Sequence, residues 1–159
     1  MQGLAPARLL ALIVPAALMA GALGSQYIGG LYPCEMCHWQ RWPHYAAIAL
    51  AALAFLLPGR GLRSFLVVFA GLAIITSGLI GVFHAGVEYR WWEGLTSCSV
   101  TSAAGSASQV LADIMATPLI RCDQPQWTLF GISLAGYNAL ISIPAGLWVL
   151  ALLARKGRA

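Results

Sequence analysis

The chain has 159 residues, of which 60% are hydrophobic and only 9% are charged, and its formal net charge is +4. About a quarter of the residues of a soluble domain are charged, so this composition excludes an ordinary soluble protein and indicates a single integral membrane domain over residues 1–159. A basic chain would also suit nucleic acid, but the placement of the charges along this one favours an explanation from membrane topology.

Four apolar stretches alternate with polar segments along the chain. Roughly 20 apolar residues, at a rise of about 1.5 Å each, form a helix long enough to cross the hydrocarbon core of a membrane. A cleaved signal peptide is the alternative for the first stretch, because Ala20-Gly21-Ala22 resembles a cleavage site. We expect an all-α integral membrane four-helix bundle with spans at residues 9–26, 42–57, 64–87 and 129–153, and with polar loops at residues 27–41 and 88–128.

The charges predict which ends of these helices face the cytoplasm. One side of the expected bundle carries six basic and no acidic residues, namely Arg8, Arg60, Arg63, Arg155, Lys156 and Arg158. The other side carries three basic and five acidic residues, namely Arg41, Arg90, Arg121, Glu35, Glu88, Glu93, Asp113 and Asp123. Because cytoplasmic loops are enriched in Lys and Arg, we expect both termini in the cytoplasm and all four cysteines on the outer, periplasmic face.

The first polar loop contains a Cys-x-x-Cys pair, Cys34 and Cys37, directly after Pro33. Proline favours the start of a helix, so both sulfurs are expected in the first helical turn, where backbone N–H groups and the helix dipole favour a thiolate. Arg41 lies one turn beyond Cys37 on the same face and should stabilise its thiolate further, whereas Glu35 should oppose this effect. The pattern therefore predicts a redox-active pair.

The long loop holds the other two cysteines, Cys98 and Cys122, which are 24 positions apart. A disulfide between them could simply brace the loop, or it could exchange with an external thiol. His84 lies near the outer end of the third expected span, where an ionisable group is a candidate for function, but a lone histidine on an apolar face can equally be a hydrogen-bonded packing residue. We interpret His44 as a packing residue, and Asn138 and Ser142 as partners in hydrogen bonds between helices.

Two other classes of protein fit parts of this pattern. The four cysteines could bind zinc or copper together with His38, His44 and His84, although structural zinc sites usually combine two closely spaced ligand pairs. Alternatively, the chain could be a membrane scaffold whose disulfides only brace its loops. Our prediction is a redox enzyme without a resident metal.

The order of the motifs resembles the bacterial disulfide bond formation protein B family (DsbB), membrane oxidases that keep the periplasmic thiol oxidase DsbA oxidised. The resemblance covers most of the chain. It rests on Pro33-Cys34-x-x-Cys37 with Arg41, on His84-Ala-Gly-Val-Glu88 with Trp91-Trp92, on Cys98, and on Arg121-Cys122-Asp123 followed by Trp127-x-Leu-Phe-Gly131. A quinone reductase similar to vitamin K epoxide reductase is disfavoured, because its reactive pair usually comes late in the bundle.

The resemblance implies a relay of thiols. A reduced DsbA-like partner would attack Cys98, the released Cys122 would engage Cys34, and Cys37 would face a quinone, either ubiquinone or menaquinone, as a thiolate. Arg41 would support the quinone site, together with Cys37 and His84. The chain would work in the bacterial inner membrane as a monomer, with no nucleic acid partner, and a general or a dedicated DsbA-like oxidase could be its partner.

Overall fold

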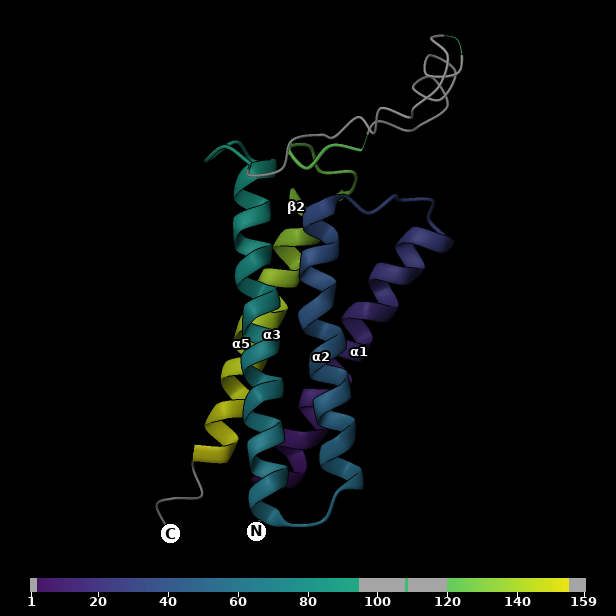
Figure 1. Ribbon diagram of the computed structural model, residues 1–159. Helices are drawn as coiled ribbons and strands as arrows, with labels where there is room; N and C mark the ends of the chain where they lie inside the picture. The colour runs from purple at the N-terminus through teal and green to yellow at the C-terminus, as the bar shows by residue number, and fades with distance from the viewer. Residues whose placement is uncertain (1–2, 95–107, 109–119, 155–159) are drawn as a thin grey trace.

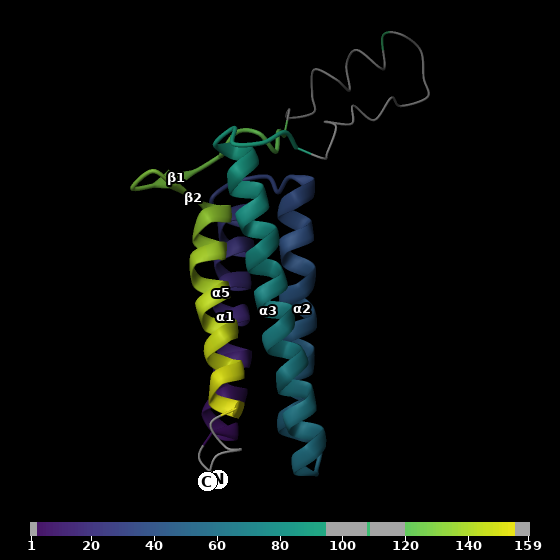
Figure 2. The ribbon, with the colours of Figure 1, turned by 90° about the vertical axis from the view of Figure 1, so that its left-hand side faces the viewer.

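In the computed structural model, which describes residues 3–94, 108 and 120–154, four long helices run side by side (Figures 1 and 2). They are α1 (Leu4–Tyr27), α2 (Glu35–Leu56), α3 (Arg60–Glu88) and α5 (Leu134–Ala154). A short hairpin of β1 (Thr128–Leu129) and β2 (Ile132–Ser133) precedes α5. The expected all-α bundle of four helices is confirmed.

Three of the described helices, α1, α3 and α5, are long and apolar enough to cross a membrane. The fourth, α2, does not reach this standard because its first three turns contain charged and polar residues, such as Glu35, Gln40 and Arg41. Residues 35–41, which we expected to lie outside the second span, form the start of α2, in accordance with the helical turn expected at the two cysteines. The apolar part of this helix follows from residue 42 onward.

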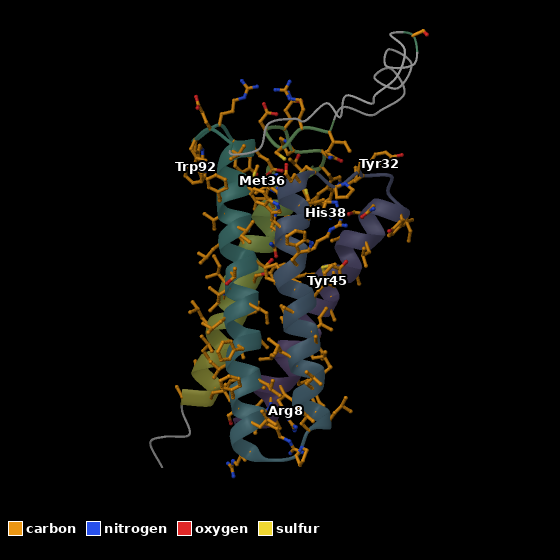
Figure 3. The ribbon with its side chains drawn as sticks, in the orientation of Figure 1. Arg8, Tyr32, Met36, His38, Tyr45 and Trp92 are labelled. Carbon is orange, nitrogen blue, oxygen red and sulfur yellow. The ribbon has the colours of Figure 1, made fainter. Side chains whose placement is uncertain are left out.

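The chain ends and the α2–α3 connection lie at one end of the bundle, and the hairpin lies at the other (Figure 1). Figure 3 shows Arg8 at the first end, whereas Tyr32, Met36, His38 and Trp92 gather at the opposite end. The turn after α2 contains Pro58 and Gly59, and Gly59 has a φ of 90°, which residues with a side chain rarely adopt. The Pro-Gly pair therefore reverses the chain at this end.

The end of the bundle that carries the chain termini is packed through small apolar side chains. Its buried cluster is composed of Ala7, Ala11, Ala47, Ala51, Ala54, Leu66, Val67, Ala70, Ile74 and Val149. Glycines bring α3 and α5 together further along: a Cβ atom on Gly81 would lie 2.9 Å from the backbone oxygen of Ala135, and one on Gly146 would lie 2.8 Å from that of Gly71. Small residues at such contacts let membrane helices approach one another closely.

The last helix begins at Leu134, five residues later than the expected residue 129. Phe130 and Gly131 both have positive φ, at 49° and 76°, and form the two-residue turn of the β1–β2 hairpin. The Ser133 hydroxyl then accepts a hydrogen bond from the backbone N–H of Gly136 at 3.1 Å, as an N-cap does. The tight turn and the cap explain why the apolar residues 129–133 are not helical.

Candidate functional site

The Cys-x-x-Cys pair lies at the N-terminus of α2. Cys34 is the N-cap residue, and its sulfur accepts a hydrogen bond from the backbone N–H of Cys37 at 3.2 Å. The two sulfurs are 2.7 Å apart, and both cysteines, like Cys122, have free thiols. The start of the helix thus presents both sulfurs in one turn, as the position of Pro33 predicts.

The two thiols differ in acidity. A hydrogen bond to Cys37, together with burial and the nearby sulfurs, holds the pKa of Cys34 far above its ordinary value. The hydrogen bond from Cys34 lowers the pKa of Cys37, which precedes the apolar part of α2, and the Arg41 charge contributes in the same direction. Cys37 is therefore the more acidic of the two thiols, and the Cys34 thiol stabilises its thiolate form through a hydrogen bond.

The sequence predicted only some of the groups that shift the pKa of Cys37. Arg41 does lower the pKa of Cys37, but it is the smallest of the contributions, and the Cys34 thiol is the largest. The carboxylate that opposes the thiolate is that of Glu88, at the end of α3, whereas the Glu35 side chain is exposed. Because Glu35 lies between the two cysteines in the sequence, its carboxylate was expected to oppose the thiolate. In the folded chain, the Glu88 carboxylate has this effect on the pKa of Cys37.

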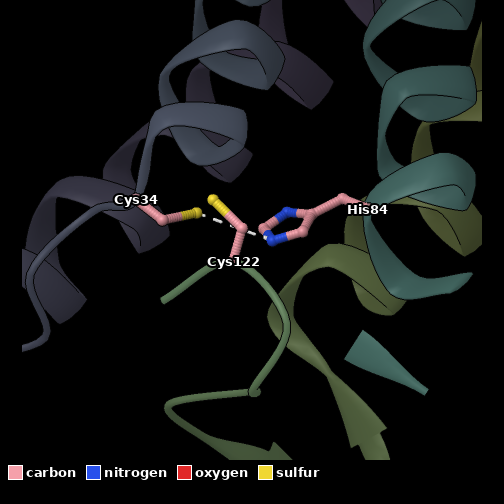
Figure 4. Close-up of side chains that lie close together, drawn as sticks. All are labelled: Cys34, His84 and Cys122. Atoms are coloured by element: carbon pink, nitrogen blue, oxygen red, sulfur yellow. Dashed lines mark hydrogen bonds between the residues drawn. The ribbon is translucent and has the colours of Figure 1, made fainter. Parts of the chain in front are cut away.

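Cys122, which is distant from the Cys-x-x-Cys pair in the sequence, lies beside Cys34 in the folded chain. Its sulfur, the Cys34 sulfur and a ring nitrogen of His84 all lie within 4.8 Å of one another, and all three residues are buried. Figure 4 shows the three side chains converging from the start of α2, from α3 and from the segment before the hairpin. Cys98, the fourth cysteine, lies outside the described residues.

His84 connects the cysteines to the interior of the bundle. Its Nε2 is 3.5 Å from the Cys34 sulfur and 3.7 Å from Oε1 of Glu88, and its Nδ1 is 2.7 Å from Nε2 of Gln40. A functional and a packing interpretation were both open for this residue. Its contact with a redox-capable sulfur favours a functional one.

A cavity of about 230 Å³ lies beside the thiols, between α1, α2 and α5. Cys37, Arg41 and His44 all line it, in accordance with their spacing on one face of α2. The guanidinium of Arg41 donates to Oε1 of Gln26 at 2.6 Å and to the backbone oxygen of Ala22 at 3.2 Å, both on α1. The cavity thus has a cationic side chain held rigidly between two helices.

Other polar residues near the cavity were missed or misread from the sequence. Asn138 does form the expected hydrogen bonds between helices, but the hydroxyl of Ser142 donates to Asn138 within α5. Gln40 and Ser77 were not singled out, and both lie in the buried network below the thiols. The only signal for Gln40 was its spacing, three residues after Cys37 and four before His44.

The chain is similar to a known family over almost its whole length. The sequence profile of the family described as disulfide bond formation protein DsbB matches residues 5–152. A disulfide bond formation protein B from Verminephrobacter eiseniae is 34% identical over 160 residues, covering 96% of this chain and 89% of the relative. Another, from Acidovorax sp. (strain JS42), is 31% identical over 163 residues, covering 97% and 91%. No solved structure matches the chain.

Proposed function

Since the chain belongs to the disulfide bond formation protein B family, we propose that it oxidises a periplasmic DsbA-like thiol oxidase and passes the electrons to a membrane quinone. Membership of the family makes the chain a disulfide-forming oxidoreductase, and its three apolar helices make it a membrane protein. The observation that carries the finer proposal is a set of three cysteine sulfurs beside a cavity that also contains a fixed arginine.

The thiol relay begins with the partner. A thiolate of the reduced partner attacks a disulfide between Cys98 and Cys122 at Cys98, and Cys122 is released. The second thiol of the partner then closes its own disulfide, so the partner loses two electrons and this chain gains them. The proximity of Cys122 to Cys34 supports the next exchange, in which the Cys122 thiolate attacks Cys34 of an oxidised Cys34–Cys37 pair. The Cys34–Cys37 bond breaks, a Cys34–Cys122 disulfide forms, and Cys37 is released as a thiolate.

The second half of the reaction takes place at the cavity. A bound quinone would accept two electrons and two protons there. The residues present fit such a group: α1 contributes apolar side chains such as Leu18 and Met19, and α2 contributes Cys37 and the Arg41 cation. Cys98 forms its disulfide with Cys122 again and releases Cys34, so that Cys34 and Cys37 together hold the two electrons. These two sulfurs would then give the electrons to the ring and form their disulfide again, and Cys37, which lines the cavity and has the lowered pKa, is the sulfur that would face the ring.

The proposal also assigns sides to the membrane. The bundle end with the α2–α3 turn carries Arg8, Arg60 and Arg63, and the positive-inside rule places this end in the cytoplasm of a bacterial inner membrane. The cysteines at the opposite end then face the oxidising periplasm, where a thiol partner is present. We propose that the chain works there as a monomer.

A reconstituted assay tests this function. The full chain in liposomes that contain ubiquinone or menaquinone is mixed with a reduced DsbA-like protein, and the loss of quinone absorbance is followed. We expect stoichiometric quinone reduction by the native chain and no reduction above background by Cys37→Ser. Glu35→Gln, which changes the exposed residue between the two cysteines, is the matched control and should keep most of the activity.

Failure of the native chain to reduce either quinone would refute the quinone step. A partner that is oxidised equally well by Cys37→Ser would show that the electrons leave by another route.

A metal site is the second candidate, because the described residues include one cluster suited to it. Cys34, Cys122 and His84 combine two sulfurs with an imidazole nitrogen, a ligand set that zinc and copper accept. The spacing of the cysteines along the sequence argued against a metal site, but the fold brings Cys34 and Cys122 together, so this argument no longer applies. Metal analysis of the purified chain separates the two functions: stoichiometric zinc or copper would favour the metal site.

A further inference from the structure

Gln40 is a buried polar side chain that the proposed thiol relay does not use. It is 7% exposed, and its amide lies between His84 on α3 and Asn138 on α5. An amide in the interior of a bundle needs partners for both its nitrogen and its oxygen, because an unpaired polar group there is costly. The partners at the two ends of this amide therefore indicate what the side chain does.

Two backbone oxygens determine which way the Gln40 amide points. One of its atoms lies 3.2 Å from the backbone oxygen of Met36, which can only accept, so this atom is the nitrogen, Nε2. At the other end, the side-chain nitrogen of Asn138 donates to the backbone oxygen of Ser77 at 3.1 Å and lies 2.8 Å from Oε1 of Gln40. A flipped Gln40 amide would place two acceptors together at the first contact and two donors at the second.

This orientation determines the tautomer of His84. Nε2 of Gln40 lies 2.7 Å from Nδ1 of His84, and an amide nitrogen only donates, so Nδ1 must accept with its lone pair. The single proton of the neutral imidazole is then on Nε2. The ring also hydrogen-bonds to the backbone of Cys122, which requires a ring N–H, and Nε2 is the nitrogen that can supply it.

The Nε2 nitrogen of His84 lies beside the Cys34 sulfur. The two atoms form a buried hydrogen bond of 3.5 Å, and with the proton on Nε2 the sulfur is the acceptor (Figure 4). Oε1 of Glu88, 3.7 Å from the same nitrogen, is a further acceptor on this side of the ring. The Cys34 sulfur also accepts from the backbone N–H of Cys37 at 3.2 Å. Two N–H donors thus face this sulfur, one from α2 and one from α3.

One step of the relay needs such donors. When the Cys98 thiolate attacks Cys122 of the Cys34–Cys122 disulfide, that bond breaks and a Cys98–Cys122 disulfide forms. Cys34 leaves with the electron pair as a thiolate, and no proton is transferred. A thiol with a high pKa is a slow leaving group, and the hydrogen bond to Cys37, burial and the nearby sulfurs hold the pKa of Cys34 far above its ordinary value. Donors that bond to the developing charge make this departure easier.

We propose that Gln40 is a positioning residue for this step, because it holds His84 in the tautomer whose Nε2–H stabilises the departing Cys34 thiolate. This role rests on the thiol relay proposed above. Without the Gln40 amide the two tautomers of His84 would compete, and one of them turns a lone pair toward the sulfur. Hydrogen bonds to charged groups are strong enough that the loss of this one should slow the release of Cys34 about tenfold.

Single-turnover exchange without quinone isolates this step. The full chain with both disulfides formed is placed in quinone-free nanodiscs and mixed with an equimolar amount of a reduced DsbA-like partner. Samples are quenched with acid, alkylated and analysed by mass spectrometry. The formation of the Cys34–Cys122 disulfide gives the rate at which Cys37 is released. The disappearance of this disulfide gives the rate at which Cys34 is released.

Gln40→Met provides a side chain of similar size without an amide. It should slow the release of Cys34 about tenfold and leave the release of Cys37 unchanged, since Cys34 is the attacked sulfur and not the leaving group in that earlier exchange. The Cys34–Cys122 disulfide should therefore accumulate in this variant. A general disturbance of the fold would slow both steps.

His84→Phe tests whether Gln40 acts through the imidazole. This variant lacks the donor, so it should slow the release of Cys34 at least as much as Gln40→Met, and the double variant should be no slower than His84→Phe. Ser142→Ala is the matched control, because Ser142 donates to Asn138 at 2.8 Å and so belongs to the same polar network, one residue removed from Gln40. It should keep both rates.

Three results would overturn the role of Gln40 and leave the proposed function standing. They are an unchanged release of Cys34 in Gln40→Met, equal slowing of both steps by this substitution, and additive effects of Gln40→Met and His84→Phe. If the Cys34–Cys122 disulfide does not form in the native chain, the relay itself is refuted, and the proposed function with it.

A measurement on the native chain needs no substitution at Gln40. In reduced, ¹⁵N-histidine-labelled protein, at a pH where the ring is neutral, Nε2 of His84 should carry the proton and Nδ1 should not. His84→Phe assigns these resonances by removing them. A ring protonated on Nδ1 would overturn the proposal even if Gln40→Met fails to fold.

Discussion

The two ends of the bundle are built from the same four helices but differ in the side chains that the helices bury. At the end where α1 begins and α5 ends, alanines such as Ala47 and Ala51 let α1, α2 and α3 pack closely around an apolar core. At the other end, α1 leans away from α2 (Figure 1), and a cavity lined by Cys37, Arg41 and His44 lies between the helices. One half of the molecule thus provides stability, and the other provides chemistry.

This comparison shows how a small membrane protein can accommodate buried polar groups. The polar side chains at the cysteine end are not scattered, because Gln40, Ser77 and Asn138 satisfy one another through hydrogen bonds. A connected network of this kind avoids the cost of isolated polar groups in an apolar environment. Among the described residues, three buried side-chain atoms have no hydrogen-bond partner: Nδ1 of His44 and Oε2 of Glu88 belong to residues that line the cavity, and Nε of Arg8 lies at the other end of the bundle.

The largest expected effect comes from removing a thiol at the cysteine end. Cys122→Ser should abolish turnover with the DsbA-like partner, because no thiolate is left to carry electrons from Cys98 to Cys34. With the oxidised partner we expect instead a covalent complex, because the free Cys98 thiolate attacks the disulfide of the partner and no Cys122 thiolate is present to resolve the mixed disulfide. Non-reducing gel electrophoresis and mass spectrometry detect this complex.

The stability of Cys122→Ser in its reduced form should match that of the reduced native chain, since the substitution leaves the apolar end intact. A fully active Cys122→Ser would contradict the relay. A variant that unfolds would contradict the division of roles between the two ends.

A smaller effect is expected from overpacking the apolar end. Ala51→Leu adds three carbon atoms to a fully buried position and should lower the free energy of unfolding by about 1–3 kcal/mol. The folded fraction should still reduce quinone at the native rate, because Ala51 is distant from the thiols. Thermal unfolding in detergent and the reconstituted assay measure the two quantities.

Ala49→Leu is the matched control for this packing test. Ala49 is exposed on the opposite face of the same helix, so the larger side chain should be accommodated there without strain. Equal destabilisation by the two substitutions would show that helix propensity or membrane insertion matters more than packing at this end.

The smallest effect concerns the acidity of Cys37. Its lowered pKa means that the thiolate is present above this pKa and is lost as the pH falls through it. Alkylation of reduced Cys37 should therefore remain fast at pH values where an ordinary cysteine reacts slowly. The rate of modification by iodoacetamide as a function of pH gives the titration curve.

Two variants rank the causes of this shift. Cys34→Ala removes the largest contribution, so the pKa of Cys37 should rise and its alkylation near pH 7 should slow. Arg41→Ala should raise the pKa less, because its charge is the smallest of the contributions. A larger effect of Arg41→Ala would mean that the cation, and not the neighbouring thiol, controls the reactivity of the pair.

Much of the site was predictable because it lies on one helix. The spacing of Cys34, Cys37 and Arg41 indicated a shared helical face, and the position of Pro33 indicated where that helix begins. These are local properties, since a helix fixes the direction of each side chain relative to its neighbours. His84 was recognised for a similar reason, as a polar residue near the end of an apolar stretch.

The sequence by itself thus determined four helices, the placement of the redox pair in a first helical turn, and the family to which the chain is similar. Only the tertiary structure decided that Cys122 lies beside Cys34 and His84, that Glu88 opposes the Cys37 thiolate, and that His44 contacts Asn138 of another helix. The physical reason is that periodicity gives the faces of each helix separately. The tilt and rotation of one helix against another follow from side-chain packing along their whole length.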